Sequence, residues 1–435
     1  MQILTLFRGH LLWRSLAVIT SFISTIILSR YLEASMTGLF FYIMAWFSFF
    51  VLIGSMGIDS AITYFISSGK TTVSHLISGV VIWLLICLTG TIIAEYFYFS
   101  QKIQSASSVP FGSLSLFIFG QLLFLFLSAF YFGLKQFGLP SAVQVIGNIL
   151  FSAFCLYHFN SSSTQLNQEL SHLFYIYPGI ICLQGLFLFI YFLLKQRAGI
   201  QLKFPDFALW RLFFSYCGLA LIANVLFFAY QRADYWLISQ SGIASDELGN
   251  YIQASRIAQL FQILPTMLAG ALFPMLSSLK EKKHEIVLPL LRICFWINIF
   301  LLGILGLSGN YLFPFLFGPS FDQVHICFVL LIPGILSLTL LSLLSAFFAS
   351  ENRLYINLSV AALAILLLMT GDGLFLKKYG LMVAPIVNSV SAIAAFMLSM
   401  FFFKNITGIK WKQILFSDRN DWGYIKTIFK RNEGA

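Results

Sequence analysis

Long runs of apolar residues dominate the chain, and short polar segments separate them. Each run is about twenty residues long, the length of a helix that crosses a hydrocarbon core of about 30 Å. Strands of a membrane barrel would alternate polar and apolar positions, and these runs show no such alternation. The pattern predicts an all-α membrane protein with about twelve transmembrane helices. They are expected at residues 11–29, 38–57, 76–98, 113–133, 141–159, 172–194, 212–238, 249–275, 288–308, 324–348, 355–372 and 381–403.

The composition supports this interpretation and excludes a water-soluble fold. Hydrophobic residues make up 59% of the chain and charged residues only 10%, whereas soluble domains carry roughly 25% charged residues. No soluble domain could bury so much apolar surface. The chain is therefore predicted to be a multi-pass membrane protein.

Lysine and arginine concentrate in alternate connections between the expected helices. Because cytoplasmic loops retain positive charge, this bias predicts that both termini are cytoplasmic and that the number of spans is even. The loops and the basic tail, residues 404–435, explain most of the net charge of +10, so no nucleic-acid partner is expected. The tail either lies on the anionic inner leaflet or is solvated.

The two halves of the sequence share one plan. The segment from Ala34 to Phe40 resembles the segment from Ala244 to Tyr251, which places Gly38 over Gly249. Six spans separate the two segments, so the halves would be parallel repeats related by an axis along the membrane normal. We expect an N-terminal six-helix bundle at 1–205, a C-terminal six-helix bundle at 206–403 and a cytoplasmic tail at 404–435.

Motifs of enzymes and metal sites are absent from the sequence. It contains no phosphate-binding glycine loop followed by lysine, and no HExxH, GxSxG or CxxC. The histidines are scattered, and the six cysteines lie in or beside apolar runs, as small core residues do. We therefore expect no catalytic residue, no metal site and no cofactor.

Ionisable residues at membrane depth are the clearest functional signal, because each costs about 2.5–3.5 kcal/mol at a helix centre unless it faces protein or water. Arg232, Asp234 and Arg256 form the main group. Asp234 and Arg256 are equally far from the turn near Ser245, so they should lie at matching depth on adjacent helices, where Asp234 could orient Arg256. Arg232 is expected to point elsewhere and to lack a local partner. Either an ion pair fixes the helix register, or the group forms a cationic cavity wall.

Other polar residues each allow two interpretations. Arg14 either reaches the inner headgroups or guards the inner mouth of a cavity. Glu95 and Asp59 lie near span ends, where they are either interfacial or take part in ion coupling. Gln144 and Asn148, four residues apart on one helix face, would bind hydroxyl-rich cargo or a neighbouring helix.

Several short motifs suggest a family. The stretch Arg30-Tyr31-Leu32 and the later Gly57-Ile58-Asp59-Ser60-Ala61 resemble the start of polysaccharide-export flippases of the Wzx type, in the multidrug/oligosaccharidyl-lipid/polysaccharide (MOP) superfamily. Ala233 to Leu237, Leu248 to Ala254 and Phe273-Pro274 resemble the seventh and eighth helices of that family. The resemblance extends over residues 1 to about 403. Tyr235 is a departure, since relatives often carry arginine there.

The resemblance implies a flippase with two MATE-like bundles around a cavity of alternating access. Its cargo would be an undecaprenyl-pyrophosphate-linked oligosaccharide, an O-antigen or similar unit, carried from the inner to the outer leaflet of a bacterial cytoplasmic membrane. The expected partners are this cargo, membrane lipids, and a polysaccharide polymerase with its chain-length machinery. Arginine suits the pyrophosphate, and a proton or sodium gradient or the membrane potential would supply the driving force.

Three alternatives remain open at this stage. A drug or metabolite exporter of the same superfamily should have a smaller, more acidic and aromatic cavity. A membrane glycosyltransferase or polysaccharide polymerase usually carries a sizeable outer loop, and no expected outer loop here exceeds about fifteen residues. A lipid II flippase normally has two further helices.

Overall fold

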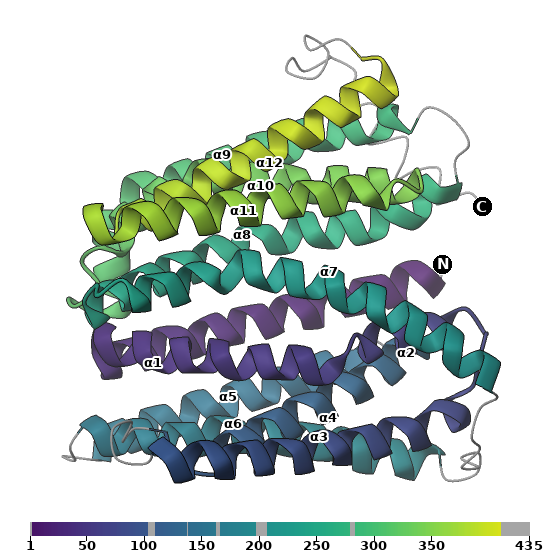
Figure 1. The fold of residues 1–435 in the computed structure, drawn as a ribbon, viewed down its shortest axis with the longest axis horizontal. Helices are drawn as coiled ribbons and strands as arrows, with labels where there is room; N and C mark the ends of the chain where they lie inside the picture. The colour runs from purple at the N-terminus through teal and green to yellow at the C-terminus, as the bar shows by residue number, and fades with distance from the viewer. Residues whose placement is uncertain are drawn as a thin grey trace. The chain divides into compact units, whose positions relative to one another are not determined.

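The structure, a computed structural model, describes residues 2–102, 109–136, 138–161, 166–196, 207–278 and 283–409. Within these ranges the chain forms helices joined by turns, and no strand occurs in them (Figure 1). The helices are α1 (Gln2–Ser55), α2 (Ile58–Ser67), α3 (Val73–Lys102), α4 (Ser113–Gly133), α5 (Gly138–Ser161), α6 (Leu166–Gln196), α7 (Phe207–Gln240), α8 (Ser245–Ser278), α9 (His284–Phe317), α10 (Val324–Ser350), α11 (Leu354–Tyr379) and α12 (Val383–Thr407).

The predicted fold class, an all-α membrane protein, is confirmed. In the described part of the chain, ten helices are long and apolar enough to cross a membrane. The apolar part of α1 covers 44 residues and contains the first two expected spans, which meet at a kink where Glu33 has a φ of 60°. Helix α8 covers the expected span 249–275, but its polar side chains make it less apolar than the others. The cytoplasmic position of the termini stays a prediction.

The chain forms two compact units. The first unit comprises Met1–Leu32 and Phe40–Val225, and the second comprises Glu33–Leu39 and Leu226–Ala435. The change from one to the other thus occurs within α7. The predicted domain boundary after residue 205 and the tail from residue 410 onward lie outside the described residues, so those divisions stay predictions.

One helix is central in each unit. In the first unit, α4 packs against α2, α3 and α6; in the second, α10 packs against α8, α9 and α12 (Figure 1). Glycine allows the closest of these approaches: a Cβ at Gly120 of α4 would lie 2.7 Å from the backbone nitrogen of Cys182 in α6, and one at Gly334 of α10 would lie 2.9 Å from the Cα of Ser389 in α12. The two units thus share this packing plan, and the parallel repeat stays a prediction.

The kink of α1 is held within the second unit. Gly38 packs against Gly249 at the start of α8, where a Cβ on Gly38 would lie 2.5 Å from the Cα of Gly249. The backbone N–H of Ala34 donates to the hydroxyl of Ser320, at 3.1 Å. The two glycines that the sequence repeat aligns therefore contact each other, and neither position has room for a side chain.

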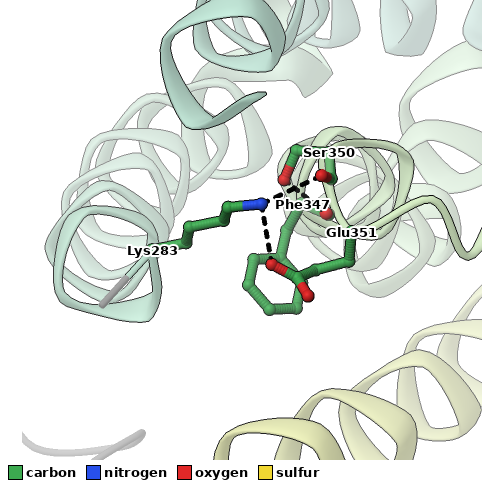
Figure 2. A network of polar contacts seen from close by, with 4 residues as sticks. All are labelled: Lys283, Phe347, Ser350 and Glu351. Carbon is green, nitrogen blue, oxygen red and sulfur yellow. Dashed lines mark hydrogen bonds and ion pairs between the residues drawn. The ribbon is translucent and has the colours of Figure 1, made fainter. Parts of the chain in front are cut away.

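A lysine ties the beginning of α9 to the end of α10 (Figure 2). Lys283 Nζ lies 2.8 Å from Glu351 Oε1 and donates to the carbonyl oxygen of Ser350 at 2.9 Å. Ser350 in turn donates from its hydroxyl to the carbonyl of Phe347, at 2.8 Å. A positive charge at a helix C-terminus interacts favourably with the free carbonyl groups there, so Lys283 caps α10.

Candidate functional site

The second unit holds a buried acidic residue at the centre of a polar cluster. Asp234 of α7 is only 1% exposed. Its Oδ2 accepts hydrogen bonds from the hydroxyl of Tyr251 in α8 and from Nδ2 of Asn388 in α12, the latter at 3.4 Å. Its Oδ1 accepts from the backbone N–H of Tyr235, at 2.9 Å. Three helices thus hold one carboxylate in a fixed position.

Arg232 lies beside this cluster and is held by neutral groups. Its Nη1 donates to the hydroxyl of Tyr235 at 2.6 Å, and its Nη2 donates to Oε1 of Gln259 in α8 at 3.3 Å. Its guanidinium lies 5.1 Å from the centre of the Tyr235 ring. The Tyr235 hydroxyl continues the chain of contacts by donating to Ser255, at 3.1 Å.

The prediction that Arg232 lacks a local partner is therefore wrong. Tyr235 is three residues further along α7, so the two side chains share one helix face. Both acceptors are neutral, and no described residue forms an ion pair with Arg232. Its positive charge interacts electrostatically with the carboxylate of Asp234, two residues further along α7.

Arg256 lies on α8, directly after Ser255, and is half-buried. Ser255 accepts a hydrogen bond from the hydroxyl of Tyr235, so this part of α8 lies beside the part of α7 that carries Asp234. The hydrogen bonds to Asp234 come from Tyr251, Asn388 and the backbone of Tyr235. The role of Asp234 in orienting Arg256 stays a prediction.

A second buried carboxylate was missed by the sequence reasoning. Asp372 of α11 is 1% exposed, and neither of its carboxylate oxygens has a hydrogen-bond partner among the described residues. It lies near enough to Asp234 for the two groups to interact electrostatically. The expected span ended at residue 372, which placed this residue at the interface. Helix α11 continues to Tyr379, and the lysines at 377 and 378 were the available sign of its later end.

The acidic residues of the first unit have different surroundings. Glu95 of α3 is 2% exposed and accepts hydrogen bonds from the backbone N–H groups of Gly112 and Ser115, at 2.8 and 3.2 Å. It thereby caps the N-terminus of α4. Asp59, in the first turn of α2, accepts a hydrogen bond from Ser60 at 3.4 Å, while its Oδ1 is buried without a partner in the described part of the chain. Ion coupling through either residue stays a prediction.

Gln144 and Asn148 face one cavity, as their spacing predicts. The cavity, of about 110 Å³, lies among α4, α5 and α6. Asn148 also donates from Nδ2 to the carbonyl of Ala17 and the hydroxyl of Thr20, both at 3.1 Å. It therefore binds the neighbouring helix α1, which was one of its two interpretations. The side chain of Arg14, on the same helix, is exposed, and both interpretations of Arg14 stay predictions.

Comparison with known families decides the assignment of the chain. The model of the polysaccharide biosynthesis protein family matches residues 9–280. The chain belongs to this family. No curated protein matches the sequence.

Solved structures show which fold the family member adopts. The lipid II flippase MurJ in an inward closed conformation is similar with a TM-score of 0.72 and 14% identity, over 99% of each chain. The MATE transporter VcmN of Vibrio cholerae has a TM-score of 0.61 at 13% identity, over 92% of this chain and 98% of that one. A MOP superfamily transporter of Pyrococcus furiosus has a TM-score of 0.63 at 13% identity, over 93% and 96%.

These matches confirm the predicted MATE-like fold, and membership of the MOP superfamily stays a prediction. This member of the polysaccharide biosynthesis protein family has the fold of these flippases and transporters. The ten long apolar helices among the described residues support a multi-pass membrane position.

Proposed function

We propose that this protein is a flippase for an undecaprenyl-pyrophosphate-linked oligosaccharide, such as an O-antigen unit, in a bacterial cytoplasmic membrane. The observation that carries the proposal is Arg232, a cation within a transmembrane helix whose hydrogen bonds go to neutral groups and whose charge interacts with Asp234 without a direct ion pair. A guanidinium with free donor capacity is suited to the oxygens of a pyrophosphate. The family match to polysaccharide biosynthesis proteins supports the same class of cargo.

The physical problem of this transport is the headgroup. A sugar hydroxyl without a hydrogen bond in hydrocarbon costs roughly 2–7 kcal/mol, so the protein must supply polar contacts while the lipid tail stays in the bilayer. An anion that leaves a negative cytoplasm gains about 2.3 kcal/mol per charge for each 100 mV. The membrane potential therefore favours outward movement of the pyrophosphate.

We further propose that Asp234 and Asp372 couple transport to a proton or sodium gradient. Two buried carboxylates that interact with each other favour a state in which one of them binds a proton or a cation. Asp372 has no hydrogen-bond donor among the described residues, so one of its oxygens can receive either. Asn388 and Tyr251 hold Asp234 in place during this exchange.

Two other cargoes remain as alternatives. A drug or metabolite exporter of the superfamily would not require Arg232. Lipid II is the second alternative, and the match to MurJ over 99% of both chains favours testing it. Both alternatives predict a different result in the experiment that follows.

The test is complementation of a bacterial strain that lacks its own oligosaccharide flippase. We expect the wild-type chain to restore surface polysaccharide, and Arg232→Ala and Arg256→Ala proteins that insert normally to restore much less. Arg353→Ala, which removes an exposed positive charge at the start of α11, is the matched control and should complement fully. Full surface polysaccharide from both variants would remove these arginines from the mechanism. Rescue of a strain that lacks its lipid II flippase would identify lipid II as the cargo.

A further inference from the structure

The cavity of the first unit, which we call the amide pocket, is lined by polar but uncharged side chains. It has a volume of about 110 Å³, and the residues that give it its character are Gln121, Gln144, Asn148, Phe151, Tyr177 and Gln184. They come from α4, α5 and α6, all of which are long and apolar enough to cross a membrane. No charged residue is among those that line the cavity.

Three of its amides have open hydrogen-bonding capacity. The side chains of Gln121, Gln144 and Gln184 form no hydrogen bond with any described residue. Each amide has one carbonyl acceptor and two N–H donors. Polar groups at membrane depth are costly without partners, so three of them around one cavity indicate that something polar occupies it.

The backbone is shaped to hold one of these amides. A Cβ at Gly147 of α5 would overlap the amide of Gln184. The absence of a side chain at Gly147 therefore leaves the space that the Gln184 amide occupies. Tyr177 lines the same cavity, with its ring 5.0 Å from that of Phe151 at an angle of 63°. Asn148 is fixed by its bonds to α1. The pocket thus combines glutamine amides that have open hydrogen-bonding capacity with an aromatic side chain and an amide that is bonded to α1.

The chemistry of the pocket selects a class of ligand. Amides both donate and accept, as hydroxyl and acetamido groups do, whereas a phosphate only accepts and a metal cation needs only acceptors. A liquid water molecule takes up roughly 30 Å³, so the cavity has room for a few waters or for one edge of a sugar ring. Aromatic rings beside the amides suit the apolar C–H faces of such a ring.

We propose that the amide pocket binds an uncharged sugar of the lipid-linked cargo through its hydroxyl or acetamido groups. The proposal rests on the proposed function and adds a sugar subsite to it.

The test measures binding of two probes to the full-length protein in lipid nanodiscs. One probe is undecaprenyl pyrophosphate, and the other is the same lipid carrying N-acetylglucosamine. We expect the wild type to bind the sugar-bearing probe about tenfold more tightly. Gln121→Leu and Gln184→Leu should abolish this preference and leave binding of the bare lipid unchanged. Gln240→Leu, at the exposed end of α7, is the matched control and should keep the preference.

The outcomes separate the two proposals. A sugar preference that persists in both variants would overturn the pocket assignment and leave water as its occupant, while the flippase proposal would stand. If neither lipid binds the wild type, the flippase proposal fails. Sugar binding by the pocket is then tested separately, with methyl N-acetylglucosaminide alone. The readout is magnetisation transfer from the protein to this sugar. Transfer in the wild type that is lost in Gln184→Leu supports the pocket assignment. No transfer in the wild type, or unchanged transfer in Gln184→Leu, rejects the assignment.

Discussion

The polar groups of the two units differ in a way that the membrane explains. In the second unit, the buried carboxylate of Asp234 and the guanidinium of Arg232 each have several fixed hydrogen-bond partners. In the first unit, the amides of Gln121 and Gln184 have none among the described residues. An uncharged amide is far less costly to bury than an ion. The comparison teaches that Asp234 and Arg232 are held by fixed partners, whereas the carboxylate of Asp372 and the amides of the first unit are left open to bind an ion or a ligand.

The most direct test of this difference between the units is to introduce a charge into the amide pocket. Gln184→Glu would place a carboxylate where no cation lines the cavity, and we expect a loss of about 2.5–3.5 kcal/mol in stability. The readout is the Tm of the purified protein in detergent, followed by tryptophan fluorescence. Gln240→Glu, at an exposed helix end, is the control. An unchanged Tm in Gln184→Glu would show that the pocket tolerates charge as well as the second unit does.

Removal of the positive charge from the second unit should have the next largest effect. Arg232→Ala deletes a charged hydrogen-bond donor, which is worth about 1.5–3 kcal/mol, so affinity for undecaprenyl pyrophosphate should fall at least tenfold. Arg232→Lys should recover part of the affinity, because it restores the charge without the planar fork. Binding is measured in nanodiscs with both variants. Equal affinities for wild type and Arg232→Ala would mean that the cation serves packing alone.

The two aspartates should respond to substitution in opposite directions. Asp234→Asn weakens the acceptor of Tyr251 and should lower stability by about 1–2 kcal/mol. Asp372→Asn removes a buried carboxylate without a partner, so stability should be unchanged or higher, while transport in proteoliposomes loses its response to an ion gradient. Asp322→Asn, an exposed substitution near the start of α10, is the control. A normal gradient response in Asp372→Asn would contradict the coupling role.

The smallest effect is expected at the ion pair that caps α10. Lys283→Met removes the contacts to Glu351 and to the carbonyl of Ser350. Both residues of the ion pair are partly solvent-exposed, so stability should fall by at most about 1 kcal/mol. Transport should be normal. This variant shows the effect of removing a charge that supports the fold and takes no part in binding. A loss of transport at normal stability would contradict that role.

Much of the fold was predictable from the sequence, because hydropathy alone defines a transmembrane helix. The expected span 113–133 coincides with α4, and the expected 324–348 lies within α10. The break between the first two spans was also placed correctly, near Glu33. These elements depend on local composition, which a sequence displays directly.

The site was less predictable because it depends on which helix faces meet. Nothing in the sequence joins Arg232 to Gln259, which belong to different helices and make contact only after packing. Gln121 and Gln184 were not singled out, since an isolated glutamine in an apolar run gives no sign of its neighbours. The sequence shows the charge of Asp372, but predicting that this residue is buried requires knowing where α11 ends. The chemical character of single residues could be predicted from the sequence, whereas the contacts between residues of different helices could not.

The kink of α1 bears on how the molecule could be divided. Glu33–Leu39 belongs to the second unit, although both flanking segments belong to the first, and α7 up to Val225 belongs to the first unit. A cut between α6 and α7 would therefore give two fragments that each lack part of their own unit and carry part of the other. Neither fragment should fold alone, and activity should require their co-expression. We therefore expect the chain to fold only as a whole, although its sequence predicts two repeated halves.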